Sequence, residues 1–127
     1  MLGIVIVDHG SRRAEANEAF LAVVERFSER SDHTIVEPAH MDLASPTLAD
    51  AFERAIARGA TRIVVHPYFL FAGRHSTEDI PRMCAEAAAS HLGLDWRMTE
   101  PLGLSDRILD AVTERIAAVL GADKETD

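Results

Sequence analysis

The chain has 127 residues, of which 47% are hydrophobic and 27% are charged, and this composition is typical of one globular domain. The formal net charge of −8 argues against binding to nucleic acid, and no apolar run approaches the roughly 20 residues that cross a membrane. The single cysteine, Cys84, cannot form an internal disulfide, so we expect a cytoplasmic protein in a reducing compartment.

Strand-like and helix-like patterns alternate along the whole sequence. Apolar, β-branched runs predict buried strands, whereas apolar residues that recur every three or four positions predict amphipathic helices. The predicted strands cover residues 2–7, 34–37, 61–65 and 95–99. The predicted helices cover residues 14–29, 46–58, about 79–91 and 106–120.

Cap residues predict where two of these helices begin and end. Ser45 followed by Pro46 is typical of a helix start, and Gly59 is typical of a left-handed helix end. For the last helix, Ser105 is the expected cap and Gly121 the expected end.

This order of elements predicts an α/β fold with three layers, αβα, around a four-stranded and mainly parallel sheet. We expect one domain over residues 1–121 and a polar tail over residues 122–127. Ligands of such sheets bind beyond the carboxyl ends of the strands. The loops at that edge are residues 8–13, 38–45, 68–77 and 100–104.

The first of these loops carries His9 directly after a buried strand, which gives the imidazole a rigid support. Gly10 permits a sharp turn or the close approach of a ligand. From its position alone, His9 either has a chemical role or only hydrogen-bonds a loop carbonyl.

The third loop combines aromatic side chains with charged ones. Phe69 and Phe71 precede Arg74, His75 and Glu78. This mixture suits a site that binds a flat organic ring and handles a cation or a proton. One of the two phenylalanines is expected to be a core residue instead, and His75 is either functional or simply solvated.

The other histidines have weaker signals. His40 is a candidate third metal ligand, but a structural or surface role is the better interpretation. His66 lies inside a strand-like run and is predicted to be packed. We assign no role to His33 and His91, which have polar surroundings in the sequence.

The motifs DHGSRR, VEPAHMDLASPTL, IVVHPYFLFAGRHSTEDIP and EPLG, in this order, resemble those of the short-form sirohydrochlorin chelatases of the CbiX/SirB type. The resemblance spans about residues 3–120. Each motif alone is weakly specific, but the ordered set is much more so. The resemblance implies the fold of one class II chelatase lobe. It also implies a lyase, either a sirohydrochlorin ferrochelatase or a cobaltochelatase, which would act in sirohaem or cobalamin biosynthesis.

The resemblance also implies roles for individual residues. His9 and His75 would be the catalytic and metal-binding residues, and the sequence does not say which of them holds the metal and which accepts protons. Neutral imidazole suits both tasks. Glu78 and Glu37 are second-tier candidates for proton transfer or for orienting the histidines. The metal would be a substrate, and the candidates are Fe²⁺, Co²⁺ and Ni²⁺. The segment around His40 favours iron. No tightly bound cofactor is expected.

The tetrapyrrole is a polycarboxylate, so an acidic protein needs a local basic rim to bind it. Arg12, Arg13 and Arg74 lie in the two site loops and are the expected carboxylate-binding residues. The chain near Ser11 opens a predicted helix and offers N–H donors to an anion. Phe69 or Phe71 would form the wall of the ring cleft.

Two expectations concern assembly and alternatives. The short forms resembled here assemble their cleft as a homodimer, so we expect a symmetric dimer. A non-catalytic carrier of metal or tetrapyrrole would need the same histidines and stays open. A hydrolase that uses Ser11 and His9 is disfavoured, because the sequence shows no acidic partner and no oxyanion motif.

Overall fold

The computed structural model describes residues 1–122, with side chains at all of these except residues 75, 76 and 122. Of the tail predicted over residues 122–127, the part from residue 123 on lies outside the described residues. The elements along the chain are β1 (Leu2–Asp8), α1 (Ala14–Arg30), β2 (Ile35–His40), α2 (Leu48–Ala57), β3 (Arg62–Pro67), the π-helix η1 (His75–Asp79), α3 (Ile80–Ala88), β4 (Asp95–Met98) and α4 (Asp106–Ala122).

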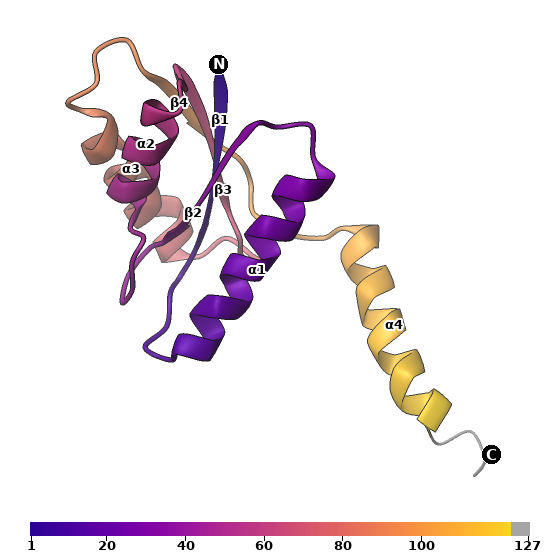
Figure 1. The fold of residues 1–127 in the computed structure, drawn as a ribbon. Coiled ribbons are helices and arrows are strands. Elements are labelled where there is room, and N and C mark those ends of the chain that lie inside the picture. The colour runs from indigo at the N-terminus through magenta and orange to yellow at the C-terminus, as the bar shows by residue number, and fades with distance from the viewer. Residues whose placement is uncertain (123–127) are drawn as a thin grey trace.

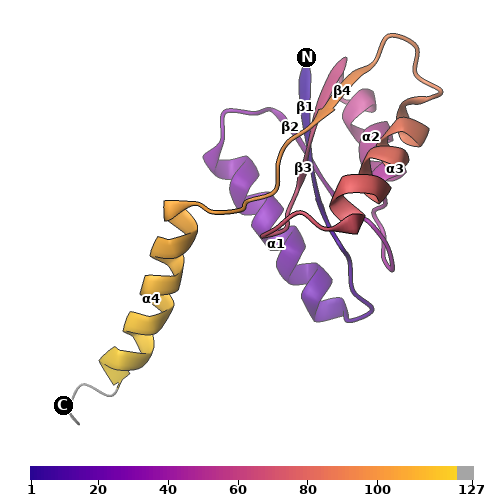
Figure 2. The same cartoon turned by 180° about the vertical axis from the view of Figure 1, so that it is seen from behind.

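The four strands form one sheet in the order β2-β1-β3-β4, and all of its pairs are parallel. Figures 1 and 2 show α1 on one face of this sheet and α2 and α3 on the other. The predicted α/β fold with a parallel four-stranded sheet between helices is therefore confirmed.

The face of the sheet beneath α2 and α3 holds the larger core, because inward-facing strand residues meet the apolar stripes of both helices. The fully or almost fully buried members of this cluster include Val5, Val7, Ile35, Leu48, Phe52, Ile63, Val65, Ile80 and Cys84. On the α1 face the buried cluster is smaller and consists of Ile4, Ile6, Phe20, Val24 and Val36.

The helix α2 begins after Thr47 rather than at Pro46, so the start predicted from the sequence is wrong by two residues. The chain is still extended there, since the His40 N–H donates to the Pro46 carbonyl at 2.7 Å and Thr47 forms a parallel bridge with His40. Thr47 then caps the helix: the Asp50 N–H donates to its hydroxyl, and its own N–H donates to the Asp50 carboxylate. These hydrogen bonds also lower the pKa of Asp50.

The third helix is predicted over about residues 79–91, and the structure differs from this at both ends. It is preceded by η1, so residues 75–77 are helical and do not belong to a loop as expected. Pro81 occupies the first turn of α3, as predicted, where its missing N–H costs little. The helix ends at Ala88, because the chain then tightens into a turn in which the His91 N–H donates to the Ala88 carbonyl.

Candidate functional site

The loop that follows β1 is fixed by backbone hydrogen bonds to the loop that follows β2. The Met41 N–H donates to the Asp8 carbonyl at 2.8 Å, and the Asp42 N–H donates to the His9 carbonyl at 3.0 Å. The His9 side chain is exposed, and its Nδ1 lies 3.3 Å from the Gly10 carbonyl oxygen. The imidazole of His9 thus stands at the carboxyl edge of the sheet on a backbone held from two sides.

Gly10 is required at this turn for two reasons. Its φ of +90° lies in the left-handed region, which side chains disfavour. A Cβ at this position would also collide with the backbone oxygen of Asp42. The sharp turn predicted from the sequence is confirmed, and the close approach that Gly10 permits is made by the chain itself.

Asn17, which the sequence reasoning missed, connects the first turn of α1 to this loop. The Ser11 N–H donates to Asn17 Oδ1 at 3.0 Å, and Asn17 Nδ2 donates to the Ser11 carbonyl at 2.7 Å. The Ser11 hydroxyl oxygen accepts the Arg13 N–H at 3.0 Å. These three hydrogen bonds fix the loop at the entrance of α1.

A buried pair lies beneath the loop. His40 is fully buried, and its Nδ1 lies 2.6 Å from Oδ1 of Asp8. Because a carboxylate oxygen accepts hydrogen bonds, the Nδ1–H of His40 is the donor in this pair. In the part of the chain that the structure describes, the Nε2 of His40 has no hydrogen-bond partner. The His40 ring also packs against the Phe20 ring.

The aromatic segment after β3 is held on both sides by backbone hydrogen bonds. The Tyr68 N–H donates to the Val7 carbonyl, and the Leu102 N–H donates to the Phe69 carbonyl at 2.9 Å. Phe69 is half-buried and packs against the larger core, whereas Phe71 is 72% exposed. Phe69 therefore packs against the core with part of its ring, and Phe71 is largely exposed.

A hollow of about 420 Å³ lies between the first loop, the start of α1 and the aromatic segment, and it brings together the predicted residues His9, Ser11 and Phe69. The side chains Phe20, Val23 and Tyr68 complete its wall. It therefore combines an exposed imidazole with an apolar, aromatic surface, on the face of the sheet that α1 covers.

The remaining predicted residues lie near this hollow in the chain but do not line it. The side chains of Arg12 and Arg13 are exposed at the start of α1. Those of Arg74 and Glu78 form an exposed ion pair at 3.8 Å. His75 is the first residue of η1, and its side chain lies outside the described atoms.

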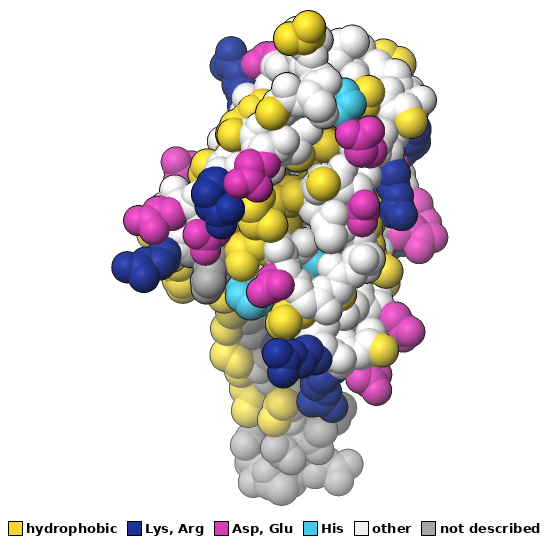
Figure 3. All heavy atoms as spheres, turned by 90° about the vertical axis from the view of Figure 1, so that its left-hand side faces the viewer, with side chains coloured by type: hydrophobic (Ala, Val, Ile, Leu, Met, Phe, Trp, Pro, Cys, Tyr) yellow, Lys and Arg dark blue, Asp and Glu magenta, His cyan; other side chains and the backbone are white. Residues whose placement is uncertain are grey.

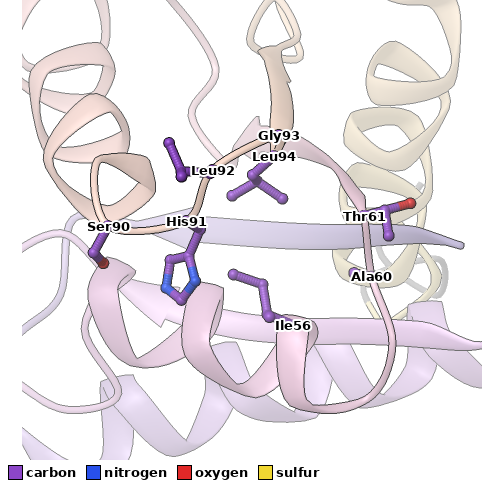
Figure 4. A pocket seen from close by; sticks show the side chains of 8 residues that line it. All are labelled: Ile56, Ala60, Thr61, Ser90, His91, Leu92, Gly93 and Leu94. Atoms are coloured by element: carbon purple, nitrogen blue, oxygen red, sulfur yellow. The ribbon is translucent and has the colours of Figure 1, made fainter.

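Another hollow, of about 470 Å³, opens at the opposite edge of the sheet, where β3 and β4 begin. Figure 4 shows the side chains of Ile56, His91 and Leu94 around it. The imidazole of His91 is 2.6 Å from the Glu53 carboxylate. Because ligands of parallel sheets bind at the other edge, this hollow is not the candidate site.

Among the described side chains, no group of three or more His, Cys, Asp or Glu residues is arranged to hold a metal ion. The described helices also include none that is long and apolar enough to cross a membrane. Cys84 is buried in the larger core, and burial raises its pKa to about 12.

Comparison with known proteins decides the family. The family model described as CbiX matches residues 3–119. The chain belongs to the CbiX family. It is 49% identical over 114 residues to the chloroplastic sirohydrochlorin ferrochelatase of Arabidopsis thaliana, which covers 90% of this chain and 51% of that protein.

Two further relatives show what this family member is similar to. The sirohydrochlorin cobaltochelatase of Methanocaldococcus jannaschii is 32% identical, over 91% of this chain and 97% of that protein. The structure of SirB from Bacillus subtilis with Fe³⁺ superposes with a TM-score of 0.88 at 27% identity, over 93% of this chain and 47% of that one. The chain thus spans about half the length of the plant and Bacillus relatives and nearly all of the archaeal one.

Proposed function

We propose that this chain inserts a divalent metal ion into a sirohydrochlorin-type tetrapyrrole. The observation that carries the proposal is the hollow in which the exposed His9 stands beside an aromatic wall, at the ligand-binding edge of a CbiX-family domain. Insertion must strip water from the metal, expose the pyrrole nitrogens and remove two N–H protons. The hollow offers an imidazole for the metal and protons and an apolar surface for the ring.

His9 and His75 are the proposed metal-binding and catalytic pair. Neutral imidazole binds first-row divalent metals well, and its unperturbed pKa near neutrality also suits proton transfer. His9 is exposed to an incoming ion. The backbone of His75 opens η1, directly after the loop that begins with the aromatic segment, which places it at the same edge of the sheet as His9.

The ring is proposed to lie against Phe69, with Phe71 as a second contact at the rim. Phe69 lines the hollow, while Phe71 exposes most of its surface and is available to a flat ligand. The carboxylates of the tetrapyrrole would be held by Arg12, Arg13 and Arg74 together with the backbone around Ser11. All three arginine side chains are exposed.

Glu78 is proposed to assist proton transfer beside His75. Its side chain is 69% exposed and its carboxylate lies 3.8 Å from Arg74, and such exposed ion pairs contribute little stability. Glu37, a second-tier candidate from the sequence, is held by Arg58 at 2.8 Å and has no such freedom. We therefore retain Glu78 and drop Glu37.

Iron is the proposed physiological metal, with cobalt as the second candidate. The higher identity to the plant ferrochelatase than to the archaeal cobaltochelatase supports iron. Imidazole affinity alone does not choose between these metals. We also propose a cytoplasmic location, on the ground that the single cysteine is a buried free thiol.

The site is proposed to be completed in a symmetric homodimer. The hollow at His9 is widely open to solvent. A second copy, related by a two-fold axis, would supply the opposite wall. Monomers at micromolar concentration with full activity would contradict this part of the proposal.

The decisive test is anaerobic metal insertion followed by the absorption spectrum of the tetrapyrrole, with Fe²⁺, Co²⁺ and Ni²⁺ in turn. Many turnovers at substoichiometric protein are expected for a chelatase. A carrier would stop at one equivalent, and this outcome would overturn the catalytic proposal in favour of metal or tetrapyrrole transport. Ser11→Ala is expected to keep insertion activity, which would dispose of a hydrolase mechanism.

A further inference from the structure

One buried polar side chain lies beside the candidate site and has no part in the proposed mechanism. On the side of the molecule seen in Figure 3, charged side chains of both signs are spread over the surface. Among the described residues, His40 is the only polar or charged one that is buried. Its Nδ1–H donates to Oδ1 of Asp8 at 2.6 Å, and its Nε2 has no hydrogen-bond partner in that part of the chain.

Stability alone does not account for this histidine. An apolar side chain of similar size would fill the same space without an unpartnered ring nitrogen, and burying such a nitrogen costs free energy. At the other end of the pair, the Asp8 side chain is 21% exposed, and Asp8 lines the hollow at His9. The hydrogen bond between Asp8 and His40 is therefore explained by what it does at the hollow.

The pair lies where the first two strands end. Asp8 and His40 are the last residues of β1 and β2, and they are partners in the parallel register. Both side chains lie on the α1 face of the sheet, since the His40 ring packs against Phe20 of α1 with the ring centroids 5.4 Å apart. The residue directly after Asp8 is His9.

His40 is held from two sides. Its backbone N–H donates to the Pro46 carbonyl at 2.7 Å, and Thr47 forms a bridge with it at the entrance of α2. Its ring contacts that of Phe20, and the Phe20 centroid lies 5.8 Å from that of Tyr68. Phe20 and Tyr68 both line the hollow. The imidazole of His40 is thus fixed between the start of α2 and the aromatic wall of the site.

The backbone of Asp8 joins this fixed imidazole to His9. The Asp8 carbonyl accepts the Met41 N–H at 2.8 Å, and the His9 carbonyl accepts the Asp42 N–H at 3.0 Å. These two hydrogen bonds connect the loops that follow β1 and β2. The side-chain hydrogen bond between Asp8 and His40 is a third connection at the same place. Because His9 follows Asp8 directly, a shift of Asp8 moves the backbone that carries the His9 imidazole.

We infer that Asp8 and His40 are positioning residues for His9. The Nδ1–H of His40 holds the Asp8 carboxylate, and with it the backbone from which the His9 imidazole extends. A group that binds a metal ion or moves a proton must be held close to its productive geometry, and a misplacement of about 1 Å is enough to slow a reaction. The inference rests on the proposed role of His9, but the position of the loop can be measured without metal insertion.

Two amide substitutions at His40 separate positioning from packing. In His40→Asn the amide occupies about the place of Nδ1 and can donate to Asp8, whereas in His40→Gln it lies one bond further out, at about the place of Nε2. Gln is closer to His in size, and Asn leaves more space unfilled. If His40 only filled space, His40→Asn would be the more damaging change. A positioning pair predicts the opposite order.

The first measurement is amide hydrogen exchange of the folded protein, followed by NMR. In His40→Gln the N–H groups of Met41 and Asp42, which donate to the Asp8 and His9 carbonyls, should exchange about 10-fold faster or more than in the parent chain. In His40→Asn they should stay near the parental rate. The Val5 N–H, in the middle of β1, corrects for any change in global stability. Equal corrected rates in the two variants would overturn the inference.

The second measurement is the split between kcat and KM in the insertion assay. His40→Gln should lower kcat by about 10-fold or more and leave the KM for the tetrapyrrole nearly unchanged, because the surfaces proposed to bind the ring are intact. His40→Asn should restore most of kcat. Asp8→Asn keeps an oxygen that accepts the Nδ1–H and should also retain most of kcat, whereas Asp8→Ala should not. Equal losses in the two Asp8 variants would give the carboxylate charge a direct role and overturn the positioning pair.

The two measurements also separate this inference from the proposed function. A parent chain that inserts no metal, with the exchange order as expected, would remove the proposed function and leave the pair as the support of the loop. If insertion falls in His9→Ala but is the same in His40→Gln and His40→Asn, the proposed function stands and the positioning pair is wrong.

Discussion

The two faces of the sheet are covered to different degrees. On one face α2 and α3 close a core in which Phe52, Ile80 and Cys84 have no exposure. On the other face α1 is the only covering helix among the described residues, and it leaves open both the hollow at His9 and a cavity lined by Ile4, Phe27 and His66. The closed face therefore acts as the scaffold, while the open face carries the candidate site.

The largest expected effect is on the closed face. Phe52→Ala should lower the free energy of unfolding by about 3–5 kcal/mol, because it removes a fully buried ring and leaves a cavity. Phe27→Ala on the open face is the control and should cost about 1 kcal/mol or less, since its ring is already 39% exposed. Urea unfolding of both variants measures the difference, and equal losses would show that the two faces do not differ as described.

The opposite behaviour is expected at the edge of the open face. His9→Ala should reduce metal insertion by about 100-fold or more, the lower range for the loss of an acid–base or ligand group. Its unfolding free energy should hardly change, because the side chain is exposed. His33→Ala, at an exposed histidine away from the hollow, should keep full activity. Normal insertion by the His9 variant would remove this residue from the mechanism.

A double variant shows how the two proposed histidines are related. If His9 and His75 act on one metal, the variant with both changed to alanine should be little slower than either single one. If they act on separate steps, the losses should multiply. Rates from the same insertion assay distinguish these outcomes.

A smaller effect on the free energy of unfolding is expected where the loop after β1 contacts the loop after β2. Gly10→Ala combines a left-handed φ with a collision against the Asp42 backbone, so it should cost about 2–3 kcal/mol. Gly93→Ala is the matched control: its φ is also positive, but no atom lies near the added Cβ. It should cost only about 1 kcal/mol. Equal melting temperatures of the two variants would show that the backbone at Asp42 moves to accommodate the added Cβ.

Most of the fold was predictable because its signals are local. The strand and helix periods gave the order of elements, and the cap at Gly59 has the positive φ expected of it. The start of α2 was wrong, since the Ser45–Pro46 signal is local whereas the bridge between His40 and Thr47 joins β2 to the helix entrance. The apolar stripe of α4 was also visible in the sequence. The direction in which α4 leaves the domain was not, because it depends on the conformation of the segment between β4 and α4.

The candidate site was predictable only in part, for a similar reason. His9 was found because a histidine directly after a buried strand stands at the ligand-binding edge. The pairing of Asp8 with His40 was missed, because these residues are 32 positions apart and only the parallel register of β1 and β2 brings them together. Asn17 was missed because nothing in the sequence tells an anchoring amide from a solvated one.

The smallest expected effect concerns pH and His66, which lines the cavity on the α1 face of the sheet. Burial lowers the pKa of His66 from its ordinary 6.5, and its Nδ1–H donates to the Thr99 hydroxyl oxygen at 2.7 Å. The folded state therefore holds the imidazole neutral, while the unfolded chain takes up a proton as pH falls through 6.5. Between pH 6.5 and the lower folded-state pKa the unfolded state binds more protons, so the free energy of unfolding should decline as pH falls and level off below that range.

His66→Asn keeps a donor near Thr99 but cannot titrate, so its unfolding free energy should fall less steeply over this window than that of the parent chain. His33→Asn, at an exposed histidine, should leave the slope unchanged. Urea unfolding between pH 7.5 and 5 measures all three proteins, and identical slopes would mean that the open face solvates His66 enough to hold its proton in the folded state as well.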